Sequence, residues 1–586
     1  MRTRVQIGSH SYAIDLAQTV RRPIASLRQT VDGNAEAGEG TLDNSALWKR
    51  TQSDFILGQG QPYFDQEEES NRRRFRAVSG FDPVSDRRAL AVAKTCSSAV
   101  AAYAGGTSGA PKLLRTRSNW WIIPTATGIV KRTASLTSFT TTNVTGTTAA
   151  KDATVFGDTT YICDGASVFS GSITGSSVSS FSTVDTDVID ATLGRLVCGH
   201  DGELFELSSA GAKVEIYTHA NPQWAWTDFA VGNAGVYCAG NDGLRSEIYL
   251  MTVIDSDGAF VAPSPVATLP AGELIRTVEY FGGFLVIGTN KGARLAQASQ
   301  SGYLNYGPRI ALGDTYGIQF DGQFAYVTCS AFPTFGGPGV VVLSMDRFTA
   351  PLTPAYAGGW PVSASGYTAY DVGANDGQVL CLVGNATNVQ LFSTVSSYGT
   401  ATFWSGQITF GTPEPKQFQV LEVVFDALTS GQSVTASVYD KQGGTLLASV
   451  TEASVGATSV LVTGESKQES FEVKIEATGA VVVRRWTIRA VPAPTYVAEE
   501  IILALILKEE VGDDDGGTLN FDVLDEWNYL TDLAREREKV ELTFGARTDN
   551  VWVDQVGVDP GAWANWDNRS RWPEGTVLVR LVTVGL

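Results

Sequence analysis

Residue types that carry out acid–base or nucleophilic chemistry are few or scattered in this sequence. Histidine occurs three times, at His10, His200 and His219, and no HExxH, GxSxG, Walker A or Rossmann motif is present. The 62 Asp and Glu residues could supply the paired carboxylates of a glycosidase. The separation of such a pair is set by the fold and not by sequence spacing, so it cannot be assessed here. We therefore predict no catalytic residue, no cofactor and no enzyme activity.

Metal-binding patterns are equally weak. His200 lies in a Gly-His-Asp-Gly turn, where a surface histidine is the simplest interpretation. The run Asp513–Asp515, followed by two glycines, is similar to a calcium loop but lacks the alternate spacing and closing glutamate of an EF-hand. No CxxC pair occurs among the six cysteines. We expect no metal site and no disulfide.

Five of the cysteines share one position in a recurring phrase. The copies are YICDG (161–165), LVCGHDG (196–202), VYCAGNDG (236–243), FAYVTCS (324–330) and QVLCLVG (378–384), with Ile287 replacing the cysteine in FLVIGTNKG (284–292). Each copy is a short run of β-branched and aromatic residues bounded by turn formers. Cysteine in such a strand behaves as a small apolar residue. We predict that these cysteines are buried and unpaired in the inner or second strand of each unit: Cys163, Cys198, Cys238, Cys329 and Cys381.

The period of the repeat selects a fold class. Units of roughly 40 residues with strand punctuation are typical of four-stranded propeller blades, whereas helical repeats would show a 3.6-residue apolar period. No such period appears between residues 110 and 410. The chain is therefore predicted to be mainly all-β, with a β-propeller over residues 91–412. We count about seven blades, from 116–124 to a last unit closing near 402–410, and the uneven spacing also allows six or eight.

Residues 1–90 do not have the pattern of a globular domain. Isolated aromatics lie in a polar, Gln- and Arg-rich stretch, and such residues need another surface to pack on. One interpretation is a flexible leader. We favour an extended docking arm that packs on its own propeller or on a neighbouring subunit. Its candidate interface residues are Phe55, Tyr63, Phe64, Arg73, Arg74 and Phe75.

Two further domains follow the propeller. Clean alternation and Gly turns predict a small β-sandwich over 413–494, ending in a Pro-rich linker. Residues 495–586 predict an α+β attachment module whose helix lies within 520–540, with Asp522 as N-cap. We expect Trp527 and Leu530 to face strands around Leu503 and Leu578. Arg535 and Arg537 would remain accessible as candidate interface residues.

Composition restricts the classes of partner. The net charge of −19 and pI of about 4.7 disfavour nucleic-acid binding, because phosphates would repel the chain. The opening MRTRVQIGSHSYAIDL has no apolar core of a secretion signal, and the apolar stretch Ile501–Leu507 is too short to span a bilayer. We expect synthesis in a cytoplasm, no export signal and no membrane insertion.

Phrases at both ends of the chain resemble minor tail proteins of long-tailed bacteriophages. In the C-terminal stretch, about residues 480–586, VVVRRWTIRAVPAP runs into IILALILKEEV, WNYLTDLAREREKVELTFG and GTVLVRLVTV. In the N-terminal arm, GQGQPYFD and RRRFRAVSGFDPVS carry the resemblance. It implies a structural component of the virion, made in the host cytoplasm and held near the tail tip in multiple copies of a symmetric assembly. The implied partners are other phage tail proteins and a host cell-surface glycan.

Three functions follow from these patterns. The first is a tail protein whose propeller is a spacer or a host-binding head. The second is a carbohydrate-active propeller enzyme, a glycoside hydrolase or lyase acting on envelope polysaccharide, which would need inward-facing channel carboxylates with a perturbed pKa. The third is a glycan-binding lectin, in which exposed Trp or Tyr side chains would stack on sugar rings.

Overall fold

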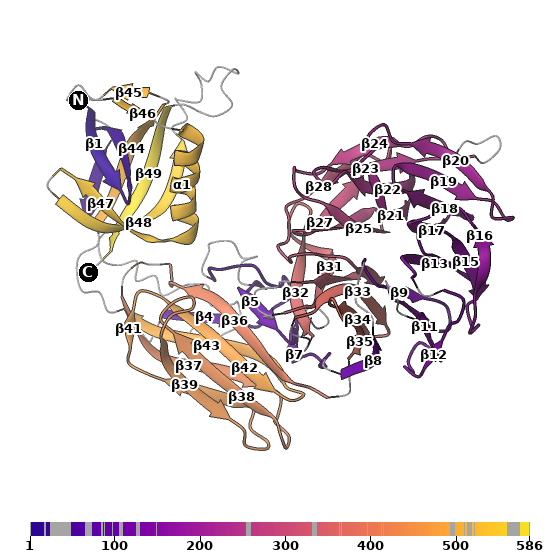
Figure 1. The fold of residues 1–586 in the computed structure, drawn as a ribbon. Coiled ribbons are helices and arrows are strands. Elements are labelled where there is room, and N and C mark those ends of the chain that lie inside the picture. The colour runs from indigo at the N-terminus through magenta and orange to yellow at the C-terminus, as the bar shows by residue number, and fades with distance from the viewer. Residues whose placement is uncertain are drawn as a thin grey trace.

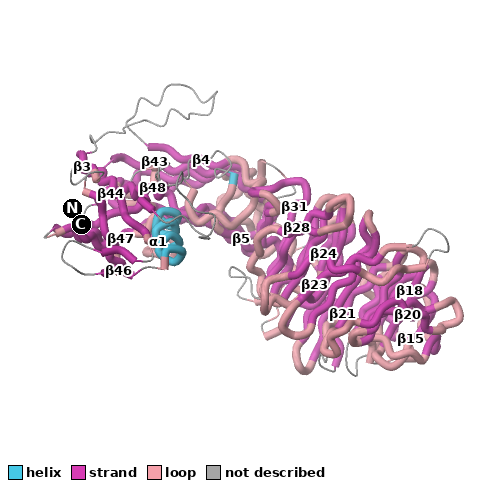
Figure 2. Tube along the Cα trace, turned by 90° about the horizontal axis from the view of Figure 1, so that it is seen from above, coloured by secondary structure: helices cyan, strands magenta, loops and turns pink. Residues whose placement is uncertain are grey.

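The molecule consists of three bodies in a row, with the propeller at one end (Figures 1 and 2). The computed structural model describes residues 2–16, 19–23, 48–64, 73–83, 86, 88–96, 98–104, 109–124, 129–147, 149–253, 259–330, 337–362, 364, 366–394, 397–411, 413, 415–492, 499–508, 510–512, 518–520, 522–545, 547–558 and 575–584. Within these ranges the chain forms 49 strands and one α-helix, so the fold is all-β with a single helical element. No helix there has the length and apolar character needed to cross a bilayer.

Seven four-stranded antiparallel sheets form the propeller. Blade 1 consists of β9 (Lys112–Arg115), β10 (Trp120–Ile123), β11 (Lys131–Thr133) and β12 (Thr141–Asn143). Blade 2 consists of β13 (Asp152–Phe156), β14 (Thr159–Cys163), β15 (Val168–Ser172) and β16 (Ser179–Ser182). Blade 3 consists of β17 (Val188–Thr192), β18 (Arg195–His200), β19 (Glu203–Leu207) and β20 (Lys213–Thr218). Blades 4 and 5 are β21 (Ala225–Gly232), β22 (Gly235–Asn241), β23 (Ser246–Met251) and β24 (Ser264–Thr268); β25 (Ile275–Phe281), β26 (Phe284–Thr289), β27 (Gly292–Ala298) and β28 (Leu304–Tyr306).

Blade 6 is β29 (Ile318–Asp321), β30 (Phe324–Cys329), β31 (Gly339–Ala350) and β32 (Thr353–Pro361). Blade 7 takes β33 (Thr368–Asn375), β34 (Gln378–Gly384) and β35 (Asn388–Ser393), and its outer strand is β8 (Ser98–Ala104), which precedes blade 1 in the sequence. The ring is therefore closed by strand pairing between the two ends of the propeller segment, which leaves no open joint between first and last blades.

The predicted repeat phrase corresponds to the second strand of a blade. Cysteines lie in β14, β18, β22, β30 and β34, with Ile287 at the same place in β26. All five of these cysteines and Ile287 are fully buried, and none of the six cysteines is bridged. The prediction of buried, unpaired blade cysteines is confirmed. Tight turns set the register, as at Asp376-Gly377, where both residues have positive φ between the paired Asn375 and Gln378.

The thiols should be unreactive in the folded protein. Burial raises the pKa of each of them, and the thiolate is the reactive form. We expect a disulfide-exchange reagent to titrate no thiol under native conditions and six after denaturation. Rapid labelling of a blade cysteine in the native protein would contradict the packing described here.

Two sheets face one another in the second body, a sandwich. One sheet contains β39 (Leu446–Glu452), β38 (Ser433–Tyr439), β42 (Phe471–Thr478), β36 (Thr400–Ile408) and β5 (Ala77–Ser79). The other contains β40 (Ser459–Thr463), β37 (Lys416–Phe425), β43 (Val482–Pro492), β7 (Leu90–Val92) and β6 (Phe81–Asp82), with β4 (Trp48–Gln52) paired to β43 and β41 (Lys467–Gln468) paired to β37.

The described residues between 48 and 92 supply strands to the sandwich, which corrects the expected boundary of the arm, and they also contact the propeller, as expected. They supply β4 to β7, because β36 and β43 would otherwise expose unpaired strand edges. The same segment joins the sandwich to blade 6. Gln59 N donates to Tyr356 O (2.8 Å), and Gly358 N donates to Gln59 Oε1 (2.9 Å). Gly58 permits this approach, since a Cβ there would lie 2.3 Å from the Tyr356 carbonyl oxygen.

Strands from both ends of the chain make the third body. Its sheet runs β2 (His10–Asp15), β1 (Arg2–Ile7), β47 (Lys539–Phe544), β48 (Arg547–Val558), β49 (Gly575–Val584), β44 (Glu499–Leu507) and β3 (Val20–Pro23), and β2 also pairs with β44, so the sheet closes on itself. A short hairpin, β45 (Glu510–Gly512) with β46 (Thr518–Asn520), lies beside it.

Helix α1 (Val523–Glu536) covers the closed sheet, with Asp522 accepting hydrogen bonds from the backbone N–H groups of Leu524 and Asp525 as expected of an N-cap. Leu530 is fully buried in one core with Leu503, and Trp527 packs against that core. Leu578 is only partly buried, because its neighbours Val577 and Val579 occupy the inward positions of β49. The prediction that Trp527 and Leu530 face the strands around Leu503 and Leu578 is confirmed, with Val577 and Val579 as the inward residues of β49.

The three bodies are nested in the sequence. The propeller lies between β7 and β36 of the sandwich, and the sandwich lies between β3 and β44 of the closed sheet. The expected boundaries shift accordingly. Strands β1 to β3 belong with β44 and β47 to β49, and the sandwich begins before residue 413, because β36 pairs with β42. The last expected propeller unit, 402–410, is this sandwich strand, and β8 takes its place in blade 7.

Candidate functional site

The innermost strands of the blades line a central channel with ionisable side chains. Six of them come from six different inner strands or their first residues: Lys112, Asp152, Asp190, Asp228, Glu279 and Asp371. Five of them are acidic and one is basic. This concentration is the most unusual chemical feature of the described residues.

Three of the carboxylates bind the neighbouring blade. Asp152 Oδ2 accepts from Ile189 N (2.9 Å), Asp228 Oδ2 from Val278 N (3.0 Å), and Asp371 Oδ2 from Leu113 N (2.6 Å). These bonds join blades 2 and 3, 4 and 5, and 7 and 1, so the last one crosses the closure of the ring. A buried carboxylate requires such partners, and the bonds fix the spacing of the inner strands.

Lys112 supplies the positive charge that partly neutralises the carboxylates of this ring. Its Nζ lies 2.7 Å from Asp152 Oδ1 and 3.9 Å from Asp228 Oδ1. Burial opposes the ammonium charge, but the carboxylates of Asp152 and Asp228 outweigh it and raise the pKa of Lys112. Lys112 therefore stays protonated at neutral pH and cannot act as a nucleophile there.

Glu279 differs from the other acids because, among the described residues, it has no hydrogen bond or ion pair. Burial raises its pKa to about 8, and the nearby carboxylates of Asp228 and Asp190 add to the shift. Burial also raises the pKa of Asp371 to about 7 and that of Asp190 to about 6. The single positive charge of Lys112 cannot neutralise five carboxylates, so some of the carboxyl groups remain protonated near neutral pH.

This shift predicts a pH dependence of stability. An unfolded glutamate loses its proton near pH 4.3, whereas folded Glu279 keeps it until about pH 8. Between these two pH values the folded state binds more protons than the unfolded state. The contribution of Glu279 to the free energy of unfolding therefore falls as pH rises and levels off above about pH 8. Replacing Glu279→Gln should remove this decline. From pH 5 to pH 9 the variant should gain at least about 1 kcal/mol relative to wild type in urea unfolding. Parallel pH curves would contradict the assignment.

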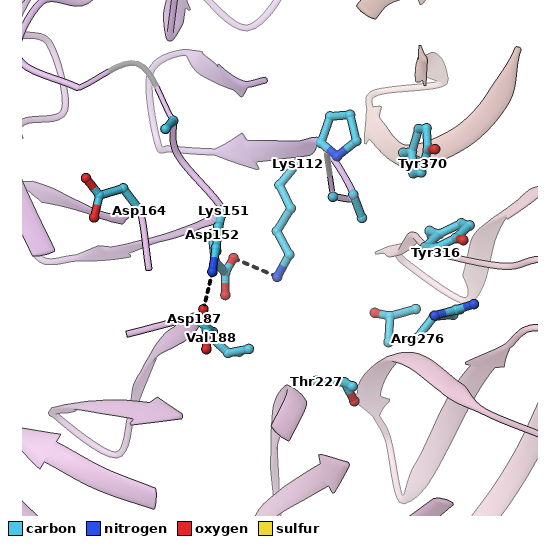
Figure 3. A pocket seen from close by; sticks show the side chains of 15 residues that line it. Lys112, Lys151, Asp152, Asp164, Asp187, Val188, Thr227, Arg276, Tyr316 and Tyr370 are labelled. Carbon is cyan, nitrogen blue, oxygen red and sulfur yellow. Dashed lines mark hydrogen bonds and ion pairs between the residues drawn. The ribbon is translucent and has the colours of Figure 1, made fainter. Parts of the chain in front are cut away.

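A cavity of about 310 Å³ opens at one mouth of the channel (Figure 3). All seven blades line it, with residues at or just before their inner strands: Lys112, Lys151, Asp152, Asp187, Thr227, Arg276, Tyr316 and Tyr370. On one wall Tyr316 and Tyr370 are in ring contact (4.9 Å), and the Arg276 guanidinium lies 5.1 Å above the Tyr316 ring. Lys112 and Asp152 face this wall from across the cavity. The cavity therefore combines aromatic surface with paired charges.

His200 contacts Asp187, one of the residues that line this cavity. Its Nδ1 is 2.8 Å from Asp187 Oδ2, and Asp187 also pairs with Lys151. Asp187, His200 and Asp201 offer ligand atoms within 4.8 Å of one another, so they could hold a cation. A cation there would compete with Lys151 for Asp187, and Asp201 is 78% exposed. The arrangement is that of a surface hydrogen-bond network.

The predicted interface residues of the arm lie inside this chain. Phe55, Phe64 and Phe75 are at most 1% exposed, in the core shared by the sandwich and blades 6 and 7. The rings of Phe55 and Phe75 contact Phe403 (5.8 and 5.1 Å), and Phe64 contacts Trp486 (4.9 Å). They pack on another domain of the same chain, so they cannot form an interface with a partner.

The other predicted interface residues of the arm differ in their solvent exposure. Tyr63 is half-buried, and burial with the nearby Glu536 raises its pKa to about 12. Arg74 is held near Gln61 and lies at the junction with blade 6, where burial lowers its pKa. Arg73 is 40% exposed and 3.6 Å from Asp54.

On the closed-sheet body, Arg535 is 65% exposed and pairs within its own helix. Arg537 reaches the sandwich at Thr409 (3.5 Å). Asp513–Asp515 and residues 559–574 lie outside the described residues.

The sequence contains a signal for the channel acids that pattern analysis did not use. An aspartate precedes four of the repeat cysteines by eight to eleven residues, in the phrases Asp152-Ala153-Thr154, Asp190-Ala191-Thr192, Asp228-Phe229-Ala230 and Asp371-Val372-Gly373. Its recurrence one strand before the cysteine, together with the propeller assignment, would have placed it in the inner strand.

Comparisons with known proteins add no family. No protein-family model and no curated protein matches the sequence. Similar solved structures include hydrazine synthase of Kuenenia stuttgartiensis (TM-score 0.38, 14% identity, 49% of this chain and 95% of that one). Also similar is virginiamycin B lyase of Staphylococcus aureus (TM-score 0.38, 10% identity, 50% of this chain and 97% of that one). A third is BamB of Moraxella catarrhalis (TM-score 0.32, 11% identity, 50% of this chain and 97% of that one). Each match spans about half of this chain, and similarity at this level carries no argument about function.

Proposed function

We propose that this chain is a structural protein of a bacteriophage tail, with the propeller as its host-surface-binding head. The closed-sheet body would attach it to other tail proteins. It would be made in the host cytoplasm, assemble in multiple copies and reside in the virion. Several weak contacts per particle would then add up to useful avidity.

The observation that carries this proposal is the placement of the body that resembles tail proteins. Within the stretch that carries the resemblance, β44, β47, β48 and β49 fold with the N-terminal strands at one end of the molecule, whereas residues 482–492 form β43 of the sandwich. The propeller lies at the other end (Figure 2). An attachment module at one end and a ring with an open cavity at the other would suit a projecting head. The inter-blade bonds of Asp152, Asp228 and Asp371 favour binding over catalysis, because acids used to hold strands are not free to transfer protons.

Particle association tests the proposal. An affinity-tagged chain should follow infectious particles through a density gradient at constant stoichiometry. Arg535→Glu reverses an exposed charge on α1 and should lower incorporation several-fold without changing thermal stability. Arg117→Glu, on a side chain that is 73% exposed on the propeller, is the matched control and should incorporate normally. A tagged protein that remains wholly in the soluble fraction would reject a tail role.

One observation favours a second function, that of a carbohydrate-active enzyme. Glu279 is an inward-facing carboxyl group without a fixed partner and with a pKa of about 8, as a general acid requires. Incubation with envelope polysaccharide, followed by an assay for new reducing ends or unsaturated products, separates the two functions. Turnover that Glu279→Gln abolishes would establish the enzyme, whereas no turnover with retained binding would favour the head.

A further inference from the structure

The cavity at the channel mouth has the size of a ligand site. Its volume of about 310 Å³ lies at the lower end of the roughly 300–1,000 Å³ typical of small-molecule pockets. Since every blade contributes to its lining, the rigid ring fixes its shape. A site of this size suits one or two sugar rings better than an extended peptide.

The charges of the lining are balanced. Lys112 pairs with Asp152, and Lys151 pairs with Asp187. Arg276 has one distant partner, Asp314 at 3.7 Å, and its buried Nε has no hydrogen-bond acceptor. Such a lining contains both donors and acceptors. Hydroxyl groups can serve both without adding charge, because each can donate to a carboxylate and accept from an ammonium or guanidinium group.

Ligands with a net charge fit less well. An anionic ligand would approach Asp152, Asp164 and Asp187, the carboxylates that line the cavity. A cationic ligand would compete with Lys112 for Asp152 or with Lys151 for Asp187. An uncharged polyhydroxylated ligand avoids both costs.

The aromatic wall supplies the remaining element. Tyr316 and Tyr370 come from adjacent blades and present their rings to the cavity opposite Lys112 (Figure 3). Aromatic rings stack on the apolar face of a sugar while hydroxyls at the sugar edge make hydrogen bonds. Stacking surface on one side and polar groups on the other match the two kinds of surface of a pyranose.

The geometry points to a binding site for a neutral saccharide residue at the channel mouth, with Tyr316 and Tyr370 as the stacking surface and Arg276, Lys112 and Thr227 among the groups that orient its hydroxyls. This inference rests on the proposed role of the propeller as a binding head, and it specifies the place and the ligand class. It predicts that uncharged sugars bind more tightly than uronic acids or sugars with a free amino group.

Saturation-transfer NMR on the full-length protein tests the inference independently of particles. The probes are glucose, galactose, mannose, rhamnose, N-acetylglucosamine and N-acetylgalactosamine, with glucuronic acid and glucosamine as charged counterparts. Each is used at about 20 mM, above the millimolar Kd of a weak single contact. At least one neutral sugar should show transfer. Tyr316→Ala combined with Tyr370→Ala should raise its Kd about tenfold.

Two matched variants keep the result interpretable. Tyr303→Ala changes a tyrosine that is 63% exposed and does not line the cavity, so it should leave the Kd unchanged. If the double tyrosine variant unfolds, Arg276→Ala provides the alternative test, and it should also weaken sugar binding. Transfer from none of the six neutral sugars, equal affinity in the cavity variants, or preference for a charged sugar would overturn the assignment. Particle association is measured separately, so failure here leaves the tail role intact.

Discussion

Replacing Phe64→Ala should lower the free energy of unfolding of the sandwich by about 3–5 kcal/mol, the usual cost of deleting a fully buried phenylalanine ring. Phe64 is 1% exposed, and its ring lies 4.9 Å from that of Trp486, also fully buried. The cavity cannot collapse easily, because Phe64 N is hydrogen-bonded to Gln407 O (2.9 Å). Urea unfolding of the full chain measures the change.

The same sandwich provides a control for this experiment. Leu446 is 50% exposed on β39, and Leu446→Ala should change stability by no more than about 0.5 kcal/mol. An effect of Phe64→Ala as small as that of the control would mean that the N-terminal segment is not part of the sandwich core. The expected difference is large enough to exclude experimental error as its source.

Replacing Asp152→Ala should destabilise the propeller by about 3–5 kcal/mol, because it removes a buried carboxylate and leaves its hydrogen-bond donors unsatisfied. The side chain is 3% exposed and serves three donors. These are Lys112 Nζ at 2.7 Å, Ala153 N at 2.7 Å and Ile189 N at 2.9 Å. Loss of the carboxylate leaves all of them without this acceptor and removes the bond between blades 2 and 3.

Two comparisons isolate the cause of that loss. Asp152→Asn keeps an acceptor and should be less damaging than the alanine change. Asp158, 66% exposed at a hairpin of the same blade, pairs with Arg117, and Asp158→Ala should cost no more than about 1 kcal/mol. Equal stability of Asp152→Ala and Asp158→Ala would show that the channel pair is not structural.

The blades could be predicted from sequence because one strand of each unit carries a local signature. A buried cysteine position followed by a turn recurs in β14, β18, β22, β30 and β34, and its meaning does not depend on distant residues. The closing strand β8 has no such signature. Its role depends on pairing with β35, about 290 residues later, and only the ring geometry determines that pairing.

The N-terminal segment shows why its assignment failed. Phe55, Phe64 and Phe75 do need another surface, as their isolation suggested, but that surface is formed by Phe403 and Trp486. Single edge strands such as β4 and β5 are too short to show alternation, so they look like irregular chain. The channel site was missed for a related reason. Its acids lie far apart in sequence, and an aspartate near a turn usually caps that turn.

The nesting of the three bodies sets the order in which a growing chain can fold. The propeller has all its strands once residue 393 has left the ribosome, the sandwich once residue 492 has, and the closed sheet only after β49. Strands β1 and β2 are made first and can pair with each other, but β3 and the closed sheet must wait for partners almost 500 residues away, such as Ile502 opposite Val20. Folding therefore proceeds from the middle of the chain outward during synthesis. A chain that stops between residues 492 and 499 has every strand of the propeller and the sandwich but none of β44 to β49. Under the proposed function, such a chain would be a binding head without its attachment body.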